Sequence, residues 1–283
     1  MYKQVLLVPT LLSIASVGFA ENTSPWLPIP GQLSLTLNVT DQTGDNAYIG
    51  DDEIKADTIT GGAANSFDRT DTSVLLQYGV SDNLAVDALL GYGESEAGTA
   101  DEDAGFTDAI LGVSWRVVDE FLTVNKLPTV TLRGAVIFAG DYDGNRLAGL
   151  GKGENGFQAS VVVGKQFTEK FSASAELGYE ERGGDVPEAT YYSLIGHYQP
   201  RSDIGLSLGY SSKEYDSDLD IGGPGFNPSR FQEVNEEREV ATFNIGWAVA
   251  AKHGVALSYA TLLDGRNTVA DDDIVALTYT FTP

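Results

Sequence analysis

SVLLQYGVSDNLAVDALLGYG, residues 73–93, consists of two alternating runs around the short polar break Ser81–Asn83. The apolar positions of the two runs are Val74, Leu76, Tyr78 and Val80, then Leu84, Val86, Ala88, Leu90 and Tyr92. A period of two predicts strands with one apolar face, because successive side chains on a strand point to opposite sides. That face must be hidden from water, either in a protein core or in lipid.

The same alternation recurs along the chain and predicts twelve strands, most of which are long enough to cross a bilayer at a tilt. The predicted strands are Gln32–Thr40, Ser73–Val80, Leu84–Tyr92, Phe106–Val118, Thr129–Ala139, Phe157–Phe167, Phe171–Glu180, Ala189–Tyr198, Ile204–Ser212, Val240–Val249, Val255–Leu262 and Ile274–Phe281.

The connections between these strands alternate in length and differ in charge. Short turns such as Ser81–Asn83 alternate with long connections at 41–72, 93–105, 140–156, 181–188, 213–239 and 263–273. The six long connections contain 31 of the 41 acidic residues and 9 of the 17 basic ones. Short periplasmic turns and long extracellular loops are typical of an outer-membrane barrel. We therefore predict an all-β fold, a single antiparallel up-and-down transmembrane barrel of about 12 strands over residues 32–283; a secreted or periplasmic β-sandwich is the alternative.

The first twenty residues, MYKQVLLVPTLLSIASVGFA, predict a secretory signal peptide. Lys3 supplies the positive region, an apolar segment follows, and Gly18 and Ala20 are small residues at the positions that a signal peptidase reads. We expect cleavage near Ala20, a periplasmic N-terminal segment at 21–31, and localisation in the outer membrane of a Gram-negative cell. The expected partners are outer-membrane lipid and lipopolysaccharide, the barrel-assembly machinery and a small-molecule solute.

The composition argues against several other classes of function. The net charge of −24 disfavours nucleic acid as a partner, since phosphate binding needs clustered Lys and Arg. The absence of cysteine excludes disulfides and cysteine metal sites. The glycine-rich stretch around Lys152 lacks the Ser or Thr of a phosphate-binding loop. We expect no cofactor, no metal site and no catalytic residues.

Lumen-facing positions are mostly Ser, Thr, Gly, Ala and Gln, with few charges. The charged inward positions are Asp87, Asp108, Arg116, Arg133, Glu176 and Glu180. Asp87, Arg116 and Arg133 lie on consecutive strands at similar distances from the short turns. They predict a polar cluster in the periplasmic third of the lumen, with Glu176 joining from across the barrel. The cluster is either a structural network or a constriction that selects solutes by charge and shape.

Four stretches carry a resemblance to a known family: GFTDAILGVSWRVV (Gly105–Val118), LPTVTLRGAVIFAGDYDG (Leu127–Gly144), GLGKGENGFQASVVVGKQF (Gly149–Phe167) and AELGYEER (Ala175–Arg182). They resemble the outer-membrane proteins associated with the MetA pathway of phenol degradation. The resemblance extends over about residues 70–281 and implies a transporter barrel for aromatic or other hydrophobic compounds. Members usually show Pro-Thr-Gly-Asp where this chain has Phe138–Asp141, which is a departure at the start of the loop.

Two other functions stay open at this point. A non-transporting structural or surface-interaction barrel is supported by the large acidic loops. An outer-membrane hydrolase would need a histidine paired with Ser or Asp near the outer rim. The two histidines do not suit that role, because His253 falls in a periplasmic turn and His197 low on its strand with no serine expected beside it. The sequence therefore favours a transporter or narrow channel over an enzyme.

Overall fold

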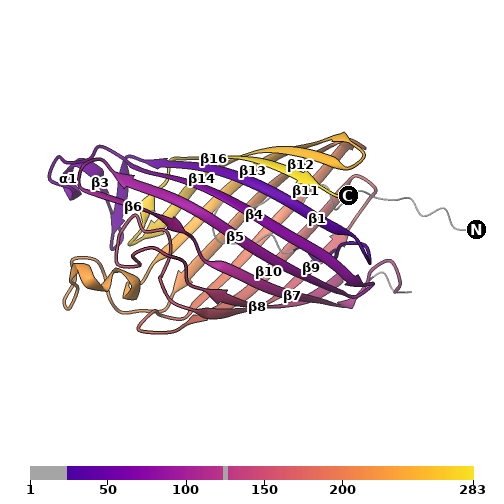
Figure 1. The fold of residues 1–283 in the computed structure, drawn as a ribbon, viewed down its shortest axis with the longest axis horizontal. Helices are drawn as coiled ribbons and strands as arrows, with labels where there is room; N and C mark the ends of the chain where they lie inside the picture. Colours follow the sequence, from indigo (N-terminus) through magenta and orange to yellow (C-terminus); the bar gives the residue numbers. More distant parts are fainter. Residues whose placement is uncertain (1–23, 124–126) are drawn as a thin grey trace, which may run out of the picture.

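The computed structural model describes residues 24–123 and 127–283 and shows a closed antiparallel β-barrel (Figure 1). Its strands are β1 (Leu33–Gly44), β4 (Phe67–Ser81), β5 (Leu84–Ala97), β6 (Asp101–Phe106), β7 (Ala109–Val118), β8 (Thr129–Phe138), β9 (Gly156–Gln166), β10 (Phe171–Arg182), β11 (Ala189–Arg201), β12 (Ile204–Tyr215), β13 (Glu237–Ala250), β14 (His253–Arg266) and β16 (Asp273–Phe281). Each strand pairs with its neighbours along the chain, and β1 closes the ring by pairing with β16.

The barrel has twelve strands because β6 and β7 together form one interrupted strand. Both pair with β5, β6 opposite Tyr92–Ala97 and β7 opposite Leu84–Leu89. The interruption falls at Thr107 and Asp108, where Thr107 N still donates to Gly91 O at 3.0 Å. The predicted twelve-stranded barrel is confirmed, and each predicted strand corresponds to one barrel strand.

Several strands continue further than the alternation of apolar residues indicated. β4 begins at Phe67 rather than Ser73, and β5 continues to Ala97 rather than Tyr92. These extensions are rich in Asp, Glu and Arg, which the sequence interpretation assigned to loops. The barrel wall projects beyond the lipid at this end, and there both faces of a strand can be polar.

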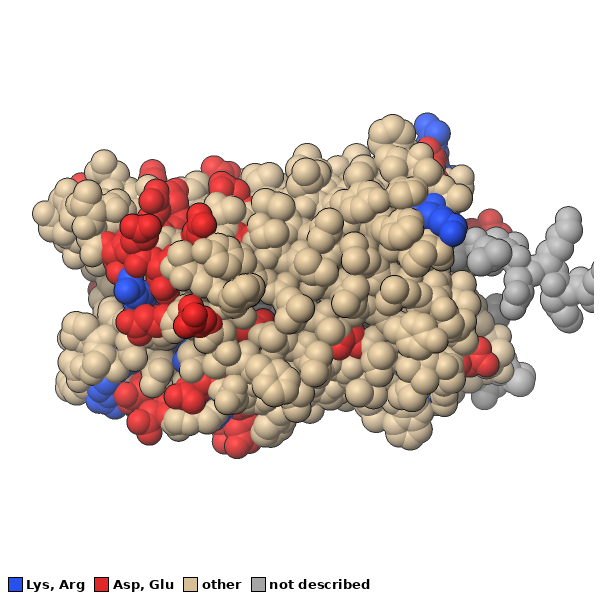
Figure 2. All heavy atoms as spheres, viewed as in Figure 1, with Lys and Arg blue, Asp and Glu red and all other residues tan. Residues whose placement is uncertain are grey.

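The outer surface of the barrel is apolar along the middle of its length. Leu90, Leu194 and Leu277 are more than half exposed, as they would be against lipid. The apolar face of residues 73–93 therefore lies against lipid. Leu76 and Val86 belong to the outer face, and Val74 pairs with Leu37 and Leu90, which are both exposed. Figure 2 shows acidic side chains gathered at the end with the long connections, and a broad band with few charged side chains beside it. Among the described residues, no helix is long and apolar enough to span a bilayer.

The long connections form a cap at one end of the barrel, which we call the loop end; the other end, with the short turns, is the turn end (Figure 1). The cap contains a small sheet of β2 (Asn46–Ile49), β3 (Asp52–Lys55) and β15 (Val269–Ala270), the short helix α1 (Ala56–Ile59) and the 3-10 helix η2 (Pro228–Glu233). Asn267, at φ 49°, holds three connections together. Its Oδ1 accepts from Gly50 N and Ile221 N, and its Nδ2 donates to Asp220 and to Asn235 O.

Candidate functional site in the barrel lumen

The lumen wall follows from the pairing register. Residues in register on adjacent strands face the same side, so one row of inward residues can be followed around the barrel. Most of the wall is polar, and all inward residues of β1 are: Ser34, Thr36, Asn38, Thr40 and Gln42. Thr278 Oγ1 donates to Asn38 Oδ1 at 2.8 Å, and Thr36 Oγ1 meets Thr280 Oγ1 at 3.3 Å. These hydrogen bonds satisfy polar side chains that would have no hydrogen-bond partner if they faced lipid.

Two of the predicted site residues meet in the lumen. Arg133 on β8 lies with its Nη2 2.6 Å from Asp87 Oδ2 on β5, and its Nε lies 3.4 Å from Oδ1. The two strands are separated by β7, which has Gly112 at the crossing point. A Cβ at Gly112 would lie 2.5 Å from both Arg133 Nη2 and Asp87 Oδ2. The glycine therefore leaves the space through which the ion pair forms.

The other two predicted site residues lie elsewhere. Arg116 donates to the carbonyl oxygen of Asp82 and lies 3.1 Å from Asp119 Oδ2. It therefore connects β7 to the β4–β5 turn and to the connection that follows β7, both at the turn end. Glu176 is buried in the lumen wall on β10, in register with Val162 and Ser193. It lies one row nearer the turn end than the row that contains Arg133.

A larger ion-pair network lies nearer the loop end. Glu180, 1% exposed, accepts from Arg182 at 2.6 Å, from Lys213 at 2.8 Å and from Gln158 Nε2 at 2.9 Å. Arg182 also lies 2.5 Å from Asp108 Oδ2. The sequence interpretation placed Asp108 and Glu180 inward but assigned Arg182 and Lys213 to loops. Continued alternation past Glu180 and Ser211 was the signal that would have found them.

The β8–β9 connection, residues 139–155, folds into the loop end of the lumen. Lys152 Nζ lies 2.7 Å from Glu236 Oε2 and 4.3 Å from the ring centroid of Tyr215. Burial would raise the pKa of Glu236, but the charges of Lys152 and Arg238 outweigh it and hold that pKa below its usual range. Glu236 is therefore ionised, and its carboxylate holds Lys152 against the lumen wall at the loop end.

Two further contacts fix the same connection. Tyr142 donates its hydroxyl hydrogen to Asp108 and accepts from Gly153 N at 3.0 Å. Burial, followed by the Asp108 carboxylate, raises the pKa of Tyr142 well above its ordinary value, so the hydroxyl remains a donor. Arg69 Nη1, on β4, donates to Gly149 O at 3.2 Å.

The turn end of the lumen is narrowed by the segment that precedes β1. Pro25 O accepts from Thr131 Oγ1 at 2.8 Å inside the barrel. Trp26 donates its ring N–H to Glu120 Oε1 at 3.1 Å and packs edge-on against His197, with 6.3 Å between ring centroids. Further along, Gly31 N donates to Gly79 O at 2.7 Å. The segment therefore crosses the lumen before it enters the wall.

A cavity of about 400 Å³ lies between these two obstructions. Trp26 lines it at the turn end, and Arg146 and Leu150 of the β8–β9 connection line it at the loop end. Asp87, Arg133 and Glu180 all contribute to its walls. A cavity of this size is in the range of small-molecule sites.

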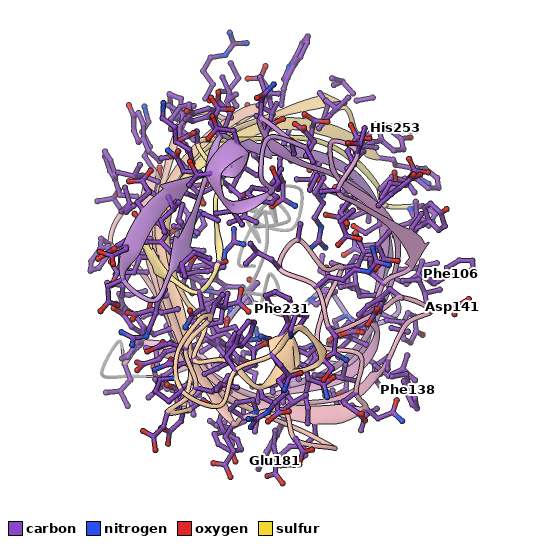
Figure 3. The ribbon with its side chains drawn as sticks, turned by 90° about the vertical axis from the view of Figure 1, so that its left-hand side faces the viewer. Phe106, Phe138, Asp141, Glu181, Phe231 and His253 are labelled. Atoms are coloured by element: carbon purple, nitrogen blue, oxygen red, sulfur yellow. The ribbon has the colours of Figure 1, made fainter. Side chains whose placement is uncertain are left out.

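Figure 3, viewed from the loop end, shows Phe106 and Phe138 projecting outward from the ring, whereas Phe231 lies within its outline.

The two histidines both lie near the turn end. His253 Nδ1 lies 2.7 Å from Tyr279 Oη on the barrel exterior. His197 faces the lumen and is in register with Ser172 and Ser207, neighbours that the sequence interpretation did not foresee. Within 24–123 and 127–283, no group of three or more His, Asp or Glu side chains has the geometry of a metal site.

Comparison with protein families gives a match over residues 39–250, three quarters of the chain, to the family described as "Putative MetA-pathway of phenol degradation". The chain belongs to this family. The resemblance seen in the sequence motifs is confirmed. No curated protein is significantly similar to the chain in sequence.

Solved structures similar to this member of the family are outer-membrane barrels. An outer membrane channel from Pseudomonas putida F1 has a TM-score of 0.72 at 15% identity, covering 95% of this chain and 100% of that one. The NanC porin has a TM-score of 0.53 at 9% identity, and the KdgM porin 0.52 at 5%; each comparison covers 87% of this chain and 98% of the porin. At these identities the likeness establishes the fold.

Proposed function

We propose that the protein is an outer-membrane channel or transporter that admits small, apolar or aromatic compounds through the barrel lumen. The observation that carries this proposal is the cavity of about 400 Å³ inside a closed barrel, bounded by a chain segment at each end. Family membership and the channel and porin structures of the same fold support it. A permanently open pore would not need these two obstructions, so we infer that one of them moves during transport.

The loop end faces the cell exterior in this proposal. Its acidic cap suits contact with lipopolysaccharide through bridging cations, and the apolar belt suits outer-membrane lipid. The signal peptide is removed near Ala20, and the barrel-assembly machinery inserts the chain. Residues 1–23 lie outside the described residues, so these steps rest on the sequence.

The Asp87–Arg133 pair is the proposed constriction within this channel. Both side chains are nearly buried in the wall and border the cavity. Arg116 pairs with Asp119 and so stabilises the connection after β7, at the turn end of the barrel. Glu176 adds a carboxylate to the wall, one row nearer the turn end than the row that contains Arg133. A buried ion pair of this kind fixes the shape of the passage as well as its local charge.

Transport is tested by reconstituting the purified protein into liposomes and measuring the entry of small aromatic alcohols by solute-driven swelling. The expected result is faster swelling than in protein-free liposomes. Equal rates with and without protein would contradict the channel proposal.

A non-transporting surface protein is the second candidate, and one observation favours it. Asn267 and Arg266 bind three connections into a continuous cap, with Arg266 lying 2.6 Å from Asp220 and also paired with Asp51. In the same liposome experiment, a protein of this second kind would leave swelling at the protein-free rate for every solute.

A further inference from the structure

One row of the lumen wall is apolar, although its neighbours are polar. Leu75 on β4 is in register with Leu89 on β5, Leu89 with Ile110 on β7, and Ile110 with Ile137 on β8. Leu75, Leu89 and Ile110 all line the cavity. On the other side of β4 the row continues to Thr36 of β1, whose inward face is polar throughout. Ile137 is 1% exposed and does not line the cavity, so the apolar patch that faces the cavity lies on three adjacent strands, β4, β5 and β7.

The Asp87–Arg133 pair borders this patch directly. Gln77 and Asp87 occupy the inward positions next to Leu75 and Leu89 on the same two strands, one row nearer the turn end. Asp87 accepts from Arg133 with both oxygens. A carboxylate offers about four lone-pair sites, so Asp87 can still accept from a further donor. The cavity therefore presents an apolar surface beside a hydrogen-bond acceptor.

This arrangement defines the chemistry of an occupant. A water-filled passage gains nothing from three adjacent large apolar side chains, since apolar area in contact with water costs about 25 cal/mol per Å². A solute with an apolar body removes that contact. A charged solute is disfavoured, because it would lose hydration beside a pair whose own charges already compensate each other.

We propose that Leu75, Leu89 and Ile110, together with the acceptor oxygens of Asp87, form a binding subsite for an uncharged small molecule with an apolar ring or chain and one hydroxyl group. The inference rests on the proposed channel function and names the class of solute that the lumen holds. The apolar body lies against the three side chains, and the hydroxyl donates to Asp87.

The test uses 4-fluorobenzyl alcohol as the probe and fluorine NMR of the full-length barrel in lipid nanodiscs. Leu75→Gln and Leu89→Gln make the apolar patch polar without changing the outer surface. Each is expected to weaken binding about tenfold, the scale on which apolar pocket contacts discriminate. Leu262→Gln is the matched control, because Leu262 packs against the buried Val240, Ala260 and Ile274 away from this cavity. It should leave the affinity unchanged.

The hydroxyl group is tested with two probes of the same ring, 4-fluorobenzyl methyl ether and 4-fluorobenzoate. Both should bind the wild-type protein about tenfold more weakly than the alcohol, since a hydrogen bond to a charged group is lost in the ether and a charge is buried in the benzoate. Heat-denaturation midpoints of the variants show whether each one folds.

Equal affinity of wild type and both folded patch variants would overturn the subsite, and so would equal affinity for the alcohol and the ether. Liposome swelling separates this failure from failure of the channel. If the protein still accelerates swelling but its affinity for the probes does not depend on the patch, the channel proposal is supported and the subsite proposal is wrong. If the protein does not accelerate swelling but the variants and probes bind with the expected differences in affinity, the subsite proposal is supported and the transport proposal is wrong.

Discussion

Arg133 reaches Asp87 across an intervening strand, and the 2.6 Å contact between them passes over a residue without a side chain. The two charges are 46 residues apart in the sequence. The contact connects β5 and β8 through the lumen, in addition to the backbone hydrogen bonds that join each of them to β7.

Removing this ion pair should destabilise the barrel. Asp87→Ala leaves the Arg133 guanidinium buried without its carboxylate, and breaking a buried pair from one side costs about 3 kcal/mol. Gly112→Ala should have a similar effect, because the new methyl group would occupy the space between the two side chains. Urea unfolding in lipid vesicles measures the loss.

The matched controls for this prediction are Asp52→Ala, on the exposed part of the cap, and Gly134→Ala, where the nearest atom to an added Cβ is 4.0 Å away. Both should leave the free energy of unfolding nearly unchanged. Equal stability of Asp87→Ala and Asp52→Ala would show that the pair does not stabilise the fold.

The Lys152–Glu236 contact should hold the β8–β9 connection inside the lumen. Lys152→Met removes the ion pair and the contact of the ammonium with Tyr215. At about 3 kcal/mol for a broken buried pair, opening of the connection should increase about a hundredfold. The Gly153 amide, which donates to Tyr142 Oη, reports the opening through hydrogen exchange. Lys55→Met, on exposed β3, should not alter that rate.

Acid should open the same connection. The pKa of Glu236 is below its ordinary value of 4.5 in the folded barrel, so its ionised form stabilises the fold at pH values above 4.5. That stabilisation is lost as the pH falls through the lower, folded-state pKa. Protection of the Gly153 amide should therefore be constant from pH 7 to 5 and decline below 4.5. Glu236→Gln should show the low protection throughout, and a wild-type decline that begins near neutral pH would implicate another group.

Surface labelling should establish the orientation of the barrel. The chain contains no cysteine, so each introduced thiol reports a single position. Asp52→Cys, in the connection 41–72, and Ser229→Cys, in the connection 213–239, should react with a membrane-impermeant maleimide on intact cells. Asp82→Cys, in the turn Ser81–Asn83, should react only after lysis. Labelling of Asp82→Cys on intact cells would reverse the orientation.

Permeation should favour neutral or cationic solutes over anions. The cap is strongly acidic, and its field lowers the local concentration of anions at the mouth. The reversal potential in a salt gradient should indicate cation preference at low ionic strength. That preference should weaken near 1 M salt, where the Debye length is about 3 Å. Anion selectivity at low salt is the contrary result.

The sequence determined the barrel, its twelve strands and the face on which the side chains of the predicted strands lie. Alternation has a period of two whatever the rest of the molecule does, and lipid permits only closed sheets of such strands. For this reason Asp87, Arg133, Glu176 and Glu180 could all be placed inward from the sequence. The boundaries at the loop end could not be placed, because alternation loses its apolar signal where the wall leaves the membrane.

Only the tertiary structure decided which members of the predicted cluster meet and which other charges pair in the lumen. The strands are tilted and staggered. A row of residues in register therefore shifts along the barrel axis from one strand to the next. One such row runs from Asp87 through Gly112, Ala135 and Gln158 to Glu180, although Asp87 lies beside a turn and Glu180 near the opposite end of its strand. Counting residues from the turns grouped Arg116 with Asp87, whereas the side chain of Arg116 reaches Asp119. The insertion of Trp26 and Lys152 into the lumen depends on contacts with distant strands, which no local pattern in the sequence records.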